Sequence, residues 1–371
     1  MAATADYLNK LIEQKNALAD NLVEKGVSAT HNETLETLVP KVLKISSGSE
    51  GIYPIGEDSR PTGDVIVSEG VISLYQYVFY RNINVMSVLL PNSLTTFSEN
   101  CFQYCTSLSK INIPDNVNKI PQNCFNECSS LLSINIPSAC TSIDSYAFQS
   151  CISLSKMTIA ENASYNLGQY AFAYCSALTN ESVHDIIEHS SSISVYIFKG
   201  CSGLTNIEVS ELWTGMFSDC NNLITAKILK ASSTGDNVFY NCSKLQEVYI
   251  SDGTVTIGTC VFKNCSSLKT VYFPSSITSA RNNSLTSTST YDYAFDGCTA
   301  LEDVQLGQDW NMSLRLDVSN NITVDSMVIM FNSLKDLTGE TAKTLTLGAT
   351  NLAKLTDEQK LIAINKNWTL A

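Results

Sequence analysis

The motif Phe-x-x-Cys-x-x-Leu occurs nine times between Phe102 and Leu301, and most copies carry a further aliphatic residue three places later. In the most regular stretch the copies start 23 residues apart, at Phe102, Phe125 and Phe148. A repeat period of about 20–50 residues is typical of chains built from stacked units, each of which packs on its neighbours. The spacing therefore predicts a solenoid, in which each repeat forms one coil.

One further, degenerate copy precedes the nine. Phe79, Asn82, Val85 and Val88 keep the spacing, with Asn in place of Cys, and Phe79 lies 23 residues before Phe102. Terminal repeats of solenoids commonly depart from the consensus. We therefore expect about ten coils in all.

Each coil is expected to contribute one short strand to a parallel sheet. Ile111, Asn112 and Ile113 alternate as strand residues do, and Pro114 ends the strand because it has no N–H to donate. The residue between the two buried positions should face solvent, and we interpret this row as a partner-binding face, although it could equally shield the sheet. Its members are Asn112, Asn135, Thr158, Glu208, Lys227, Tyr249, Tyr272 and Gln305. Tyr249 and Tyr272 should lie about 5 Å apart in adjacent coils.

The repeat resembles the BspA-type leucine-rich repeats of bacteria, which follow the cadence AFxxCxxLxxIxIPxxVxxI. The resemblance covers Val71 to about Leu306. It implies a leucine-rich-repeat solenoid of short parallel strands with some α segments. Members of that family are mostly surface proteins and adhesins, but a fold by itself does not specify an activity.

The cysteines follow the repeat. Nine of the thirteen occupy the same position of the motif, which favours buried, unpaired thiols over a disulfide framework. Cys101, Cys105, Cys124 and Cys128 imitate the spacing of a zinc site. Cys101 and Cys124, however, stand just before the repeat phenylalanine, where Ala147 stands in the next copy. We therefore predict no metal and no cofactor.

Residues 1–45 form a separate segment. Apolar residues at helical spacing predict helices over roughly 4–25 and 32–43, with a capping-box pattern at Thr30 and Glu33. Imperfect heptads indicate one of two arrangements. The first is a coiled coil between chains, for example in a homotrimer, and the second is a helical hairpin that packs on itself. The positions assigned to attachment or oligomerisation are Leu8, Leu11, Leu18 and Leu22.

The same segment has a resemblance of its own. The string YLNKLIEQKNALADNLVEKGVSATHNETLETLVPKVLKI is similar to the N-terminal module of tail-fibre and other tail-associated proteins of phages and prophages. That resemblance implies a virion location and contacts with other tail or baseplate proteins. It would also account for the expected lack of a secretory signal, since Met1 to Asn9 has no basic start.

The remaining boundaries follow from composition and pattern. We predict a linker over 46–64, the solenoid over 65–316 and a C-terminal cap over 317–371. Within the solenoid, LTNESVHDIIEHS predicts a helix capped at Thr179. A second insertion, Ser275 to Tyr291, is rich in Ser, Thr and Asn, and is read either as a binding loop or as an idle one.

The cap is expected to contain both helix and strand. A helix is predicted over 323–337, a strand near 344–347, and a further helix opened by Thr356 and Gln359. The stretch LTDEQKLIAINKNWTLA resembles the C-terminal cap of BspA-like proteins. Such a lid would cover the apolar end of the last coil.

Several function classes find no support. The net charge of −13 argues against binding to nucleic acid or to an anionic membrane, and no run of 18 apolar residues suggests membrane insertion. The three histidines lie apart from cysteines or carboxylates at ligand spacing, and no familiar catalytic motif occurs. We therefore predict that the chain is not an enzyme.

Recognition is the function that these observations favour. The first interpretation is a phage or prophage tail appendage, a receptor-binding fibre whose solenoid contacts a host cell-surface protein or glycan. The alternative is a secreted BspA-like adhesin at the bacterial surface. A second alternative is an intracellular protein-interaction scaffold.

Overall fold

The computed structural model describes residues 42–43, 61–67 and 69–371. The chain divides into two compact units. The first holds the described residues up to Ala171 together with Glu188–Ser192, and the second holds Phe172–Ile187 and Ile193–Ala371. Most of the predicted helical module, including Leu8, Leu11, Leu18 and Leu22, therefore lies outside the described residues.

The first strands extend the sheet further towards the N-terminus than expected. β1 (Val42–Leu43) pairs in parallel with β2 (Gly63–Val67). The helix predicted over 32–43 is thus wrong at its last two residues, because the open edge of β2 offers backbone partners that outweigh the helical pattern. Gly63 and Asp64, assigned to a linker, also belong to β2.

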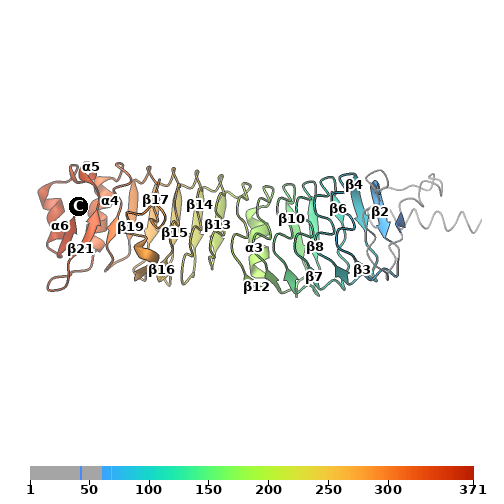
Figure 1. Cartoon of the computed structure of the whole chain (residues 1–371). Coiled ribbons are helices and arrows are strands. Elements are labelled where there is room, and N and C mark those ends of the chain that lie inside the picture. Colours follow the sequence, from blue (N-terminus) through green and yellow to red (C-terminus); the bar gives the residue numbers. More distant parts are fainter. Residues whose placement is uncertain (1–41, 44–60, 68) are drawn as a thin grey trace, which may run out of the picture. The chain divides into compact units, whose positions relative to one another are not determined.

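Parallel pairing between successive coils organises the first unit. In β8 and β10, Asn135 pairs with Thr158 and Ile134 with Met157, which is the 23-residue offset of the sequence repeat. Figure 1 shows these strands following one another in chain order. The further strands up to Ile193 are β3 (Ser73–Leu74), β4 (Val85–Leu89), β5 (Thr96–Phe97), β6 (Lys110–Ile111), β7 (Lys119–Ile120), β8 (Ser133–Ile136), β9 (Ser142–Ile143), β10 (Lys156–Ile159), β11 (Tyr165–Leu167) and β12 (Ser190–Ile193).

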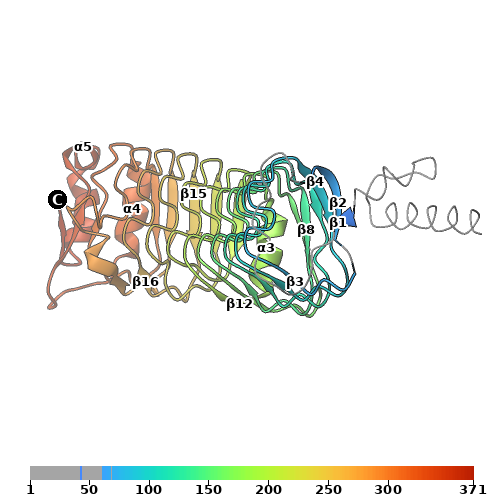
Figure 2. The same cartoon turned by 45° about the vertical axis from the view of Figure 1, so that its right-hand side comes forward.

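The second unit carries the most regular sheet. Its five parallel strands follow in the order β13, β14, β15, β17 and β19, and Figures 1 and 2 show them side by side. They span Asn206–Val209, Thr225–Ile228, Glu247–Ile250, Thr270–Phe273 and Asp303–Leu306. Two short strands, β16 (Thr256–Ile257) and β18 (Ser279–Ala280), pair separately, and η3 (Arg281–Asn283) follows β18. The predicted parallel-strand repeat fold is confirmed by this register.

A column of phenylalanines fills the interior of each unit. In the first unit the ring centroids of Phe79 and Phe102 lie 4.9 Å apart and those of Phe102 and Phe125 lie 5.4 Å apart, with nearly parallel planes. In the second unit Phe239 and Phe262 stack at 6.0 Å. All five side chains are at most 1% exposed. One aromatic ring per coil therefore removes apolar surface from water along the whole unit.

The repeat cysteine satisfies a buried backbone acceptor. Its thiol donates to the carbonyl of the phenylalanine one coil earlier, as in Cys105 to Phe79 at 3.0 Å and Cys242 to Phe217 at 3.1 Å. In the degenerate first copy Asn82 replaces the cysteine. Its Nδ2 also donates to a backbone carbonyl, that of Pro61, at 2.8 Å. A small apolar side chain with a weak donor suits this position because unpaired buried carbonyls are costly.

Tyrosine side chains lie against glycine at two turns of the second unit. A Cβ placed on Gly200 would come within 2.3 Å of the Tyr174 ring, and one on Gly215 within 2.0 Å of the Tyr196 ring. Both glycines also have positive φ, of 70° and 63°. Only glycine fits these two turns while the ring covers the backbone.

The predicted helical insertion forms α3 (Asn180–Glu188). The hydroxyl of Thr179 accepts a hydrogen bond from the Ser182 N–H at 3.2 Å, which is the expected N-cap. Val183 and Ile186 are buried. No helix in the described part of the chain has the length and apolarity to cross a membrane.

The C-terminal residues contain the expected mixture of elements. They are β20 (Leu314–Arg315), α4 (Val324–Ser333), β21 (Lys343–Thr346), α5 (Ala349–Leu352), α6 (Asp357–Ile364) and β22 (Trp368–Leu370). Thr356 and Gln359 form the predicted capping box. α4 ends before residue 337 because Trp310 takes its backbone partners there, with its N–H on the Ser333 carbonyl and its carbonyl on the Lys335 N–H.

The domain boundaries drawn from the sequence stay predictions. β20 precedes the expected boundary at residue 317 and yet pairs with β21 beyond it. The role of residues 317–371 as a lid over the last coil likewise stays a prediction.

Candidate binding face

Five of the eight predicted face residues form one row across the sheet of the second unit. Cα partners in the strand register run from Glu208 to Lys227, to Tyr249, to Tyr272 and to Gln305. The row points outward because its neighbours on either side along each strand, such as Val248 and Ile250, are buried. We call these five residues the tyrosine face.

Two stacked rings lie at the centre of the tyrosine face. The ring centroids of Tyr249 and Tyr272 are 4.7 Å apart and their planes differ by 8°, which confirms the predicted distance. Tyr249 is 41% exposed, while Tyr272 is half-buried. Burial, then Tyr249 and then Asp252 raise the pKa of the Tyr272 hydroxyl. The pair is therefore an aromatic surface with one well-exposed ring.

Exposed charges of both signs surround the rings. Lys227 Nζ lies 3.4 Å from Glu208 Oε1, and both side chains are about half exposed. At the other end Gln305 Nε2 donates to Asp303 Oδ2 at 2.7 Å. Such exposed pairs are weak and can exchange partners at little cost. The tyrosine face thus offers donors and acceptors beside an aromatic centre.

A second polar row runs beside the tyrosine face and was not predicted. It lies two residues earlier on each strand, where Asn206, Thr225, Glu247, Thr270 and Asp303 are in register. Thr225 Oγ1 donates to Asn206 Oδ1 at 2.7 Å. Strand alternation places residues i and i+2 on one side, so the period of two could have revealed this row.

The three remaining predicted residues lie in the first unit and divide into two kinds. Asn135 and Thr158 are exposed and directly paired in register. Asn112 is half-buried, with its Oδ1 accepting from the Leu90 N–H at 2.7 Å and its Nδ2 donating to the Leu90 carbonyl at 3.0 Å. Asn112 is therefore less open to solvent than expected, and its part in partner binding stays a prediction. β6 ends at Ile111, so this side chain completes the pairing that the backbone no longer makes.

A cavity of mixed polar and apolar lining opens beside Asn112 and has a volume of about 150 Å³. Its polar side chains are those of Ser87, Lys110, Asn112, Ser133 and Asn135. Ser87 Oγ also donates to Asp64 Oδ1 at 2.6 Å. The Asn112 side chain is hydrogen-bonded to the Leu90 backbone, so on that side of the cavity its polar atoms are already engaged.

The insertion from Ser275 to Tyr291 is held against the second unit. Arg281 forms an ion pair with Asp236, Arg315 Nη1 donates to the Ser287 carbonyl at 2.9 Å, and the Cys260 thiol donates to the Tyr291 carbonyl at 2.9 Å. The insertion helps to line a second polar cavity of about 250 Å³. Its polar side chains are those of Thr278, Asn283, Thr286, Asn311, Ser313 and Lys343.

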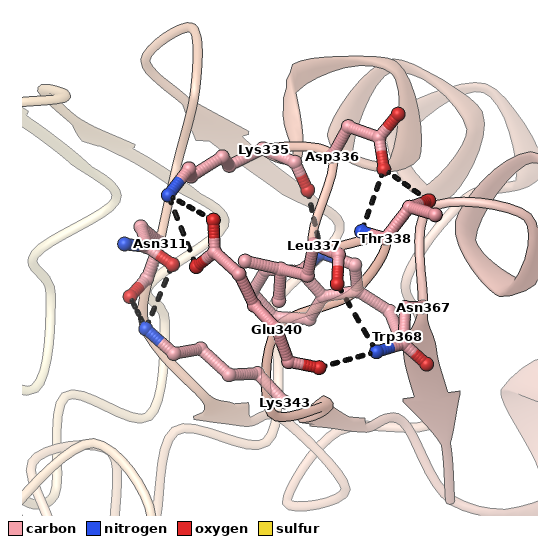
Figure 3. A network of polar contacts seen from close by, with 9 residues as sticks. All are labelled: Asn311, Lys335, Asp336, Leu337, Thr338, Glu340, Lys343, Asn367 and Trp368. Atoms are coloured by element: carbon pink, nitrogen blue, oxygen red, sulfur yellow. Dashed lines mark hydrogen bonds and ion pairs between the residues drawn. The ribbon is translucent and has the colours of Figure 1, made fainter.

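Lys343, which lines this second cavity, belongs to a network of polar contacts that also includes Lys335, as Figure 3 shows. Lys343 Nζ donates to Asn311 Oδ1 at 2.7 Å, and Lys335 Nζ donates to the two Glu340 carboxylate oxygens at 2.9 and 3.1 Å. Burial, with Lys335 as a further cause, lowers the pKa of Lys343. Both ammonium groups are thus engaged in anchoring neighbouring loops.

The described residues bring together no group of three or more His, Cys, Asp or Glu side chains that could hold a metal ion. All thirteen cysteines are buried and unbridged. Burial raises the pKa of the Cys220 thiol to about 12, and it also raises that of Cys242 and Cys265, so these repeat cysteines carry no thiolate near neutral pH. The cysteine column therefore serves packing.

Comparison with protein families gives one match. The model described as BspA type Leucine rich repeat region matches in six copies over residues 59–179 and 165–291, which is more than half of the chain. The N-terminal 58 residues lie outside this match. The comparison with curated proteins gives no match.

Solved structures similar to this chain include leucine-rich repeat proteins from bacteria. A leucine-rich repeat protein from Bacteroides ovatus is 20% identical, with 92% of this chain and 94% of that chain covered and a TM-score of 0.46. A leucine rich cell surface protein from Faecalibacterium prausnitzii is 19% identical over 72% and 87%, with a TM-score of 0.32. The pneumococcal vaccine antigen PcpA is 15% identical over 83% and 84%, with a TM-score of 0.41. Values this low carry no argument about function.

Proposed function

The chain belongs to the family of BspA-type leucine-rich repeat proteins, and from that premise we propose that it is a non-enzymatic recognition protein of the bacterial surface. Its ligand is a host cell-surface protein or a glycan, and the tyrosine face is the contact surface. The family resemblance supports the surface location, because BspA-like proteins are mostly surface proteins and adhesins.

The stacked pair of Tyr249 and Tyr272 is the observation that carries the proposal. Rings held 4.7 Å apart on adjacent strands are rigid, so binding to them costs little conformational entropy. Tyrosine supplies both an apolar ring and a polar hydroxyl, and it is enriched at the energetic centres of interfaces. An exposed aromatic pair in a polar setting matches a protein epitope or the apolar face of a sugar ring.

The composition of the tyrosine face favours binding over catalysis. Its five members are one acid, one base, two tyrosines and an amide, and the acid already contacts the base. General acid–base catalysis needs a group whose pKa lies near the working pH. The rise in the pKa of Tyr272 moves that hydroxyl further from neutrality.

The tail-fibre interpretation receives no such support. It depends on the resemblance of residues 7–45, of which the structure describes only Val42 and Leu43. The family match begins at residue 59 and includes none of that segment. Virion attachment, a homotrimer and contacts with baseplate proteins therefore stay predictions, as does the intracellular scaffold.

Alanine substitution at the two rings tests the proposal. The double variant Tyr249→Ala with Tyr272→Ala should bind at least about 30-fold more weakly, because loss of even one aromatic hot-spot residue costs about 2 kcal/mol or more. Binding is measured with labelled protein on an array of extracellular-matrix proteins and glycans, and the hits are titrated by interferometry.

The matched control is Tyr291→Ala, which removes an 85% exposed tyrosine from the insertion instead of from the tyrosine face. It should leave affinity unchanged. Melting curves of all variants identify any loss of fold. Equal affinity of wild type and the double variant for every hit would reject the tyrosine face as the binding surface.

A further inference from the structure

Two cysteines of adjacent coils meet in the interior of the first unit. The sulfur atoms of Cys101 and Cys124 lie 3.4 Å apart, close enough for a weak S–H···S hydrogen bond. Both side chains are fully buried. They stand one 23-residue repeat apart, in the position just before the phenylalanine. They therefore occupy equivalent places in consecutive coils.

This position differs from that of the repeat cysteines. Cys128, for example, donates its thiol to the Phe102 carbonyl at 3.2 Å, so its sulfur is directed at the backbone. The hydrogen bond at Cys124 joins it to the Cys101 thiol instead. In the next coil the position is held by Ala147, which is also fully buried. A thiol is thus not required there for packing.

The backbone around the pair sets a spacing that suits a disulfide. Asn100 N donates to the Gln122 carbonyl at 3.1 Å and Phe102 N to the Cys124 carbonyl at 3.0 Å, so the two coils are hydrogen-bonded on either side of Cys101. Neighbouring strands lie about 4.7–4.9 Å apart, and disulfides span Cα separations of about 4.4–6.8 Å. Closing the bond needs the sulfurs to approach by about 1.4 Å, which side-chain rotation can supply.

We propose that Cys101 and Cys124 are a site of intrachain disulfide formation that clamps two consecutive coils together under oxidising conditions. The oxidant is a low-molecular-weight disulfide. The thiolate of one cysteine attacks it and releases one thiol, and the second cysteine then attacks the mixed disulfide and releases the other. Each protein thiol loses one proton and one electron, and the oxidant is reduced to two thiols.

Burial of the two thiols controls when the disulfide can form. Desolvation, together with the neighbouring Cys101 thiol, raises the pKa of Cys124, so the folded coil holds Cys124 as an unreactive thiol. Reaction needs the coil to open, or the chain to meet the oxidant while it folds. The bond should therefore form readily during oxidative folding and slowly in the folded protein.

Oxidative refolding of the full chain tests the proposal. Protein unfolded in urea with reductant is refolded in a mixture of oxidised and reduced glutathione, and a second sample is treated without unfolding. Both samples are then unfolded in urea containing N-ethylmaleimide, which caps the free thiols, and cross-links are located by proteolysis and tandem mass spectrometry. We expect Cys101 linked to Cys124 in the refolded sample, with the other eleven cysteines capped.

A stability measurement with matched variants completes the test. The oxidised wild type should melt about 5 °C above the reduced form, because the bond restricts the unfolded chain. The double variant Cys101→Ala with Cys124→Ala, which copies the alanine of the next coil, should show no such difference. Capping of all thirteen cysteines in both samples would overturn the proposal, and so would cross-links scattered over the repeat cysteines.

Discussion

The exposed sheet surfaces of the two units differ although their coils are alike. In the first unit the outward residues are an amide and a hydroxyl, Asn135 and Thr158, and the amide of Asn112 is bound to the backbone. In the second unit the equivalent row carries opposite charges and a stacked pair of tyrosines. The inward positions of both units hold the same phenylalanine and cysteine columns.

This difference distinguishes the inward positions of a repeat, which pack the core, from the outward positions, which face solvent. An inward side chain touches the coils before and after it, so a change of size there disturbs close packing. An outward side chain meets solvent and can vary almost freely. The repeat therefore supplies constant inward positions, and the recognition proposed above would depend on a few outward positions of the second unit.

The largest expected effect on stability comes from removing a phenylalanine ring from the core. Phe239→Ala removes a fully buried ring and should lower the free energy of unfolding by about 3–5 kcal/mol, as should Phe125→Ala in the first unit. Urea unfolding followed by circular dichroism measures both. Tyr249→Ala is the outward control and should change stability by about 0.5 kcal/mol or less. A loss below about 1 kcal/mol for both phenylalanine variants would show that this column is not the core.

A smaller effect should separate two asparagines at equivalent positions of the first unit. Asn112→Ala breaks two hydrogen bonds with the Leu90 backbone and should cost about 1–2 kcal/mol. Asn135→Ala removes an exposed side chain and should cost about 0.5 kcal/mol or less. The same unfolding experiment measures the difference, and equal costs would contradict the structural role of Asn112.

The smallest effect concerns ionisation of the tyrosine face. The pKa of Tyr272 is raised in the folded state, so the folded chain holds this proton more tightly than the unfolded chain does. The resulting stability is complete below the unfolded tyrosine pKa of about 10 and is lost as the pH rises through that value towards the folded pKa. Stability measured from pH 9 to 11 should therefore fall less in Tyr272→Phe than in wild type. Identical slopes would argue against a raised pKa.

Much of the repeat fold could be predicted from the amino-acid sequence. The spacing of phenylalanine, cysteine and leucine predicted the parallel coils, and the cap at Thr179 and the capping box at Thr356 located two helices correctly. Local signals sufficed there because the partners lie within a few residues or one repeat. The predicted helix end at residue 337 was wrong, since α4 ends at Ser333. There Trp310, remote in sequence, takes the backbone groups of Ser333 and Lys335.

The amino-acid pattern by itself determined the repeat, its register and the row of residues that faces outward, since a period of 23 residues with strand alternation leaves little freedom. Only the tertiary structure decided which members of that row are available. It showed that Asn112 is bound to Leu90, that Tyr249 and Tyr272 stack, and that Cys101 meets Cys124. These contacts depend on side-chain directions and on where a strand ends, and both are set by packing between coils, which no single repeat encodes.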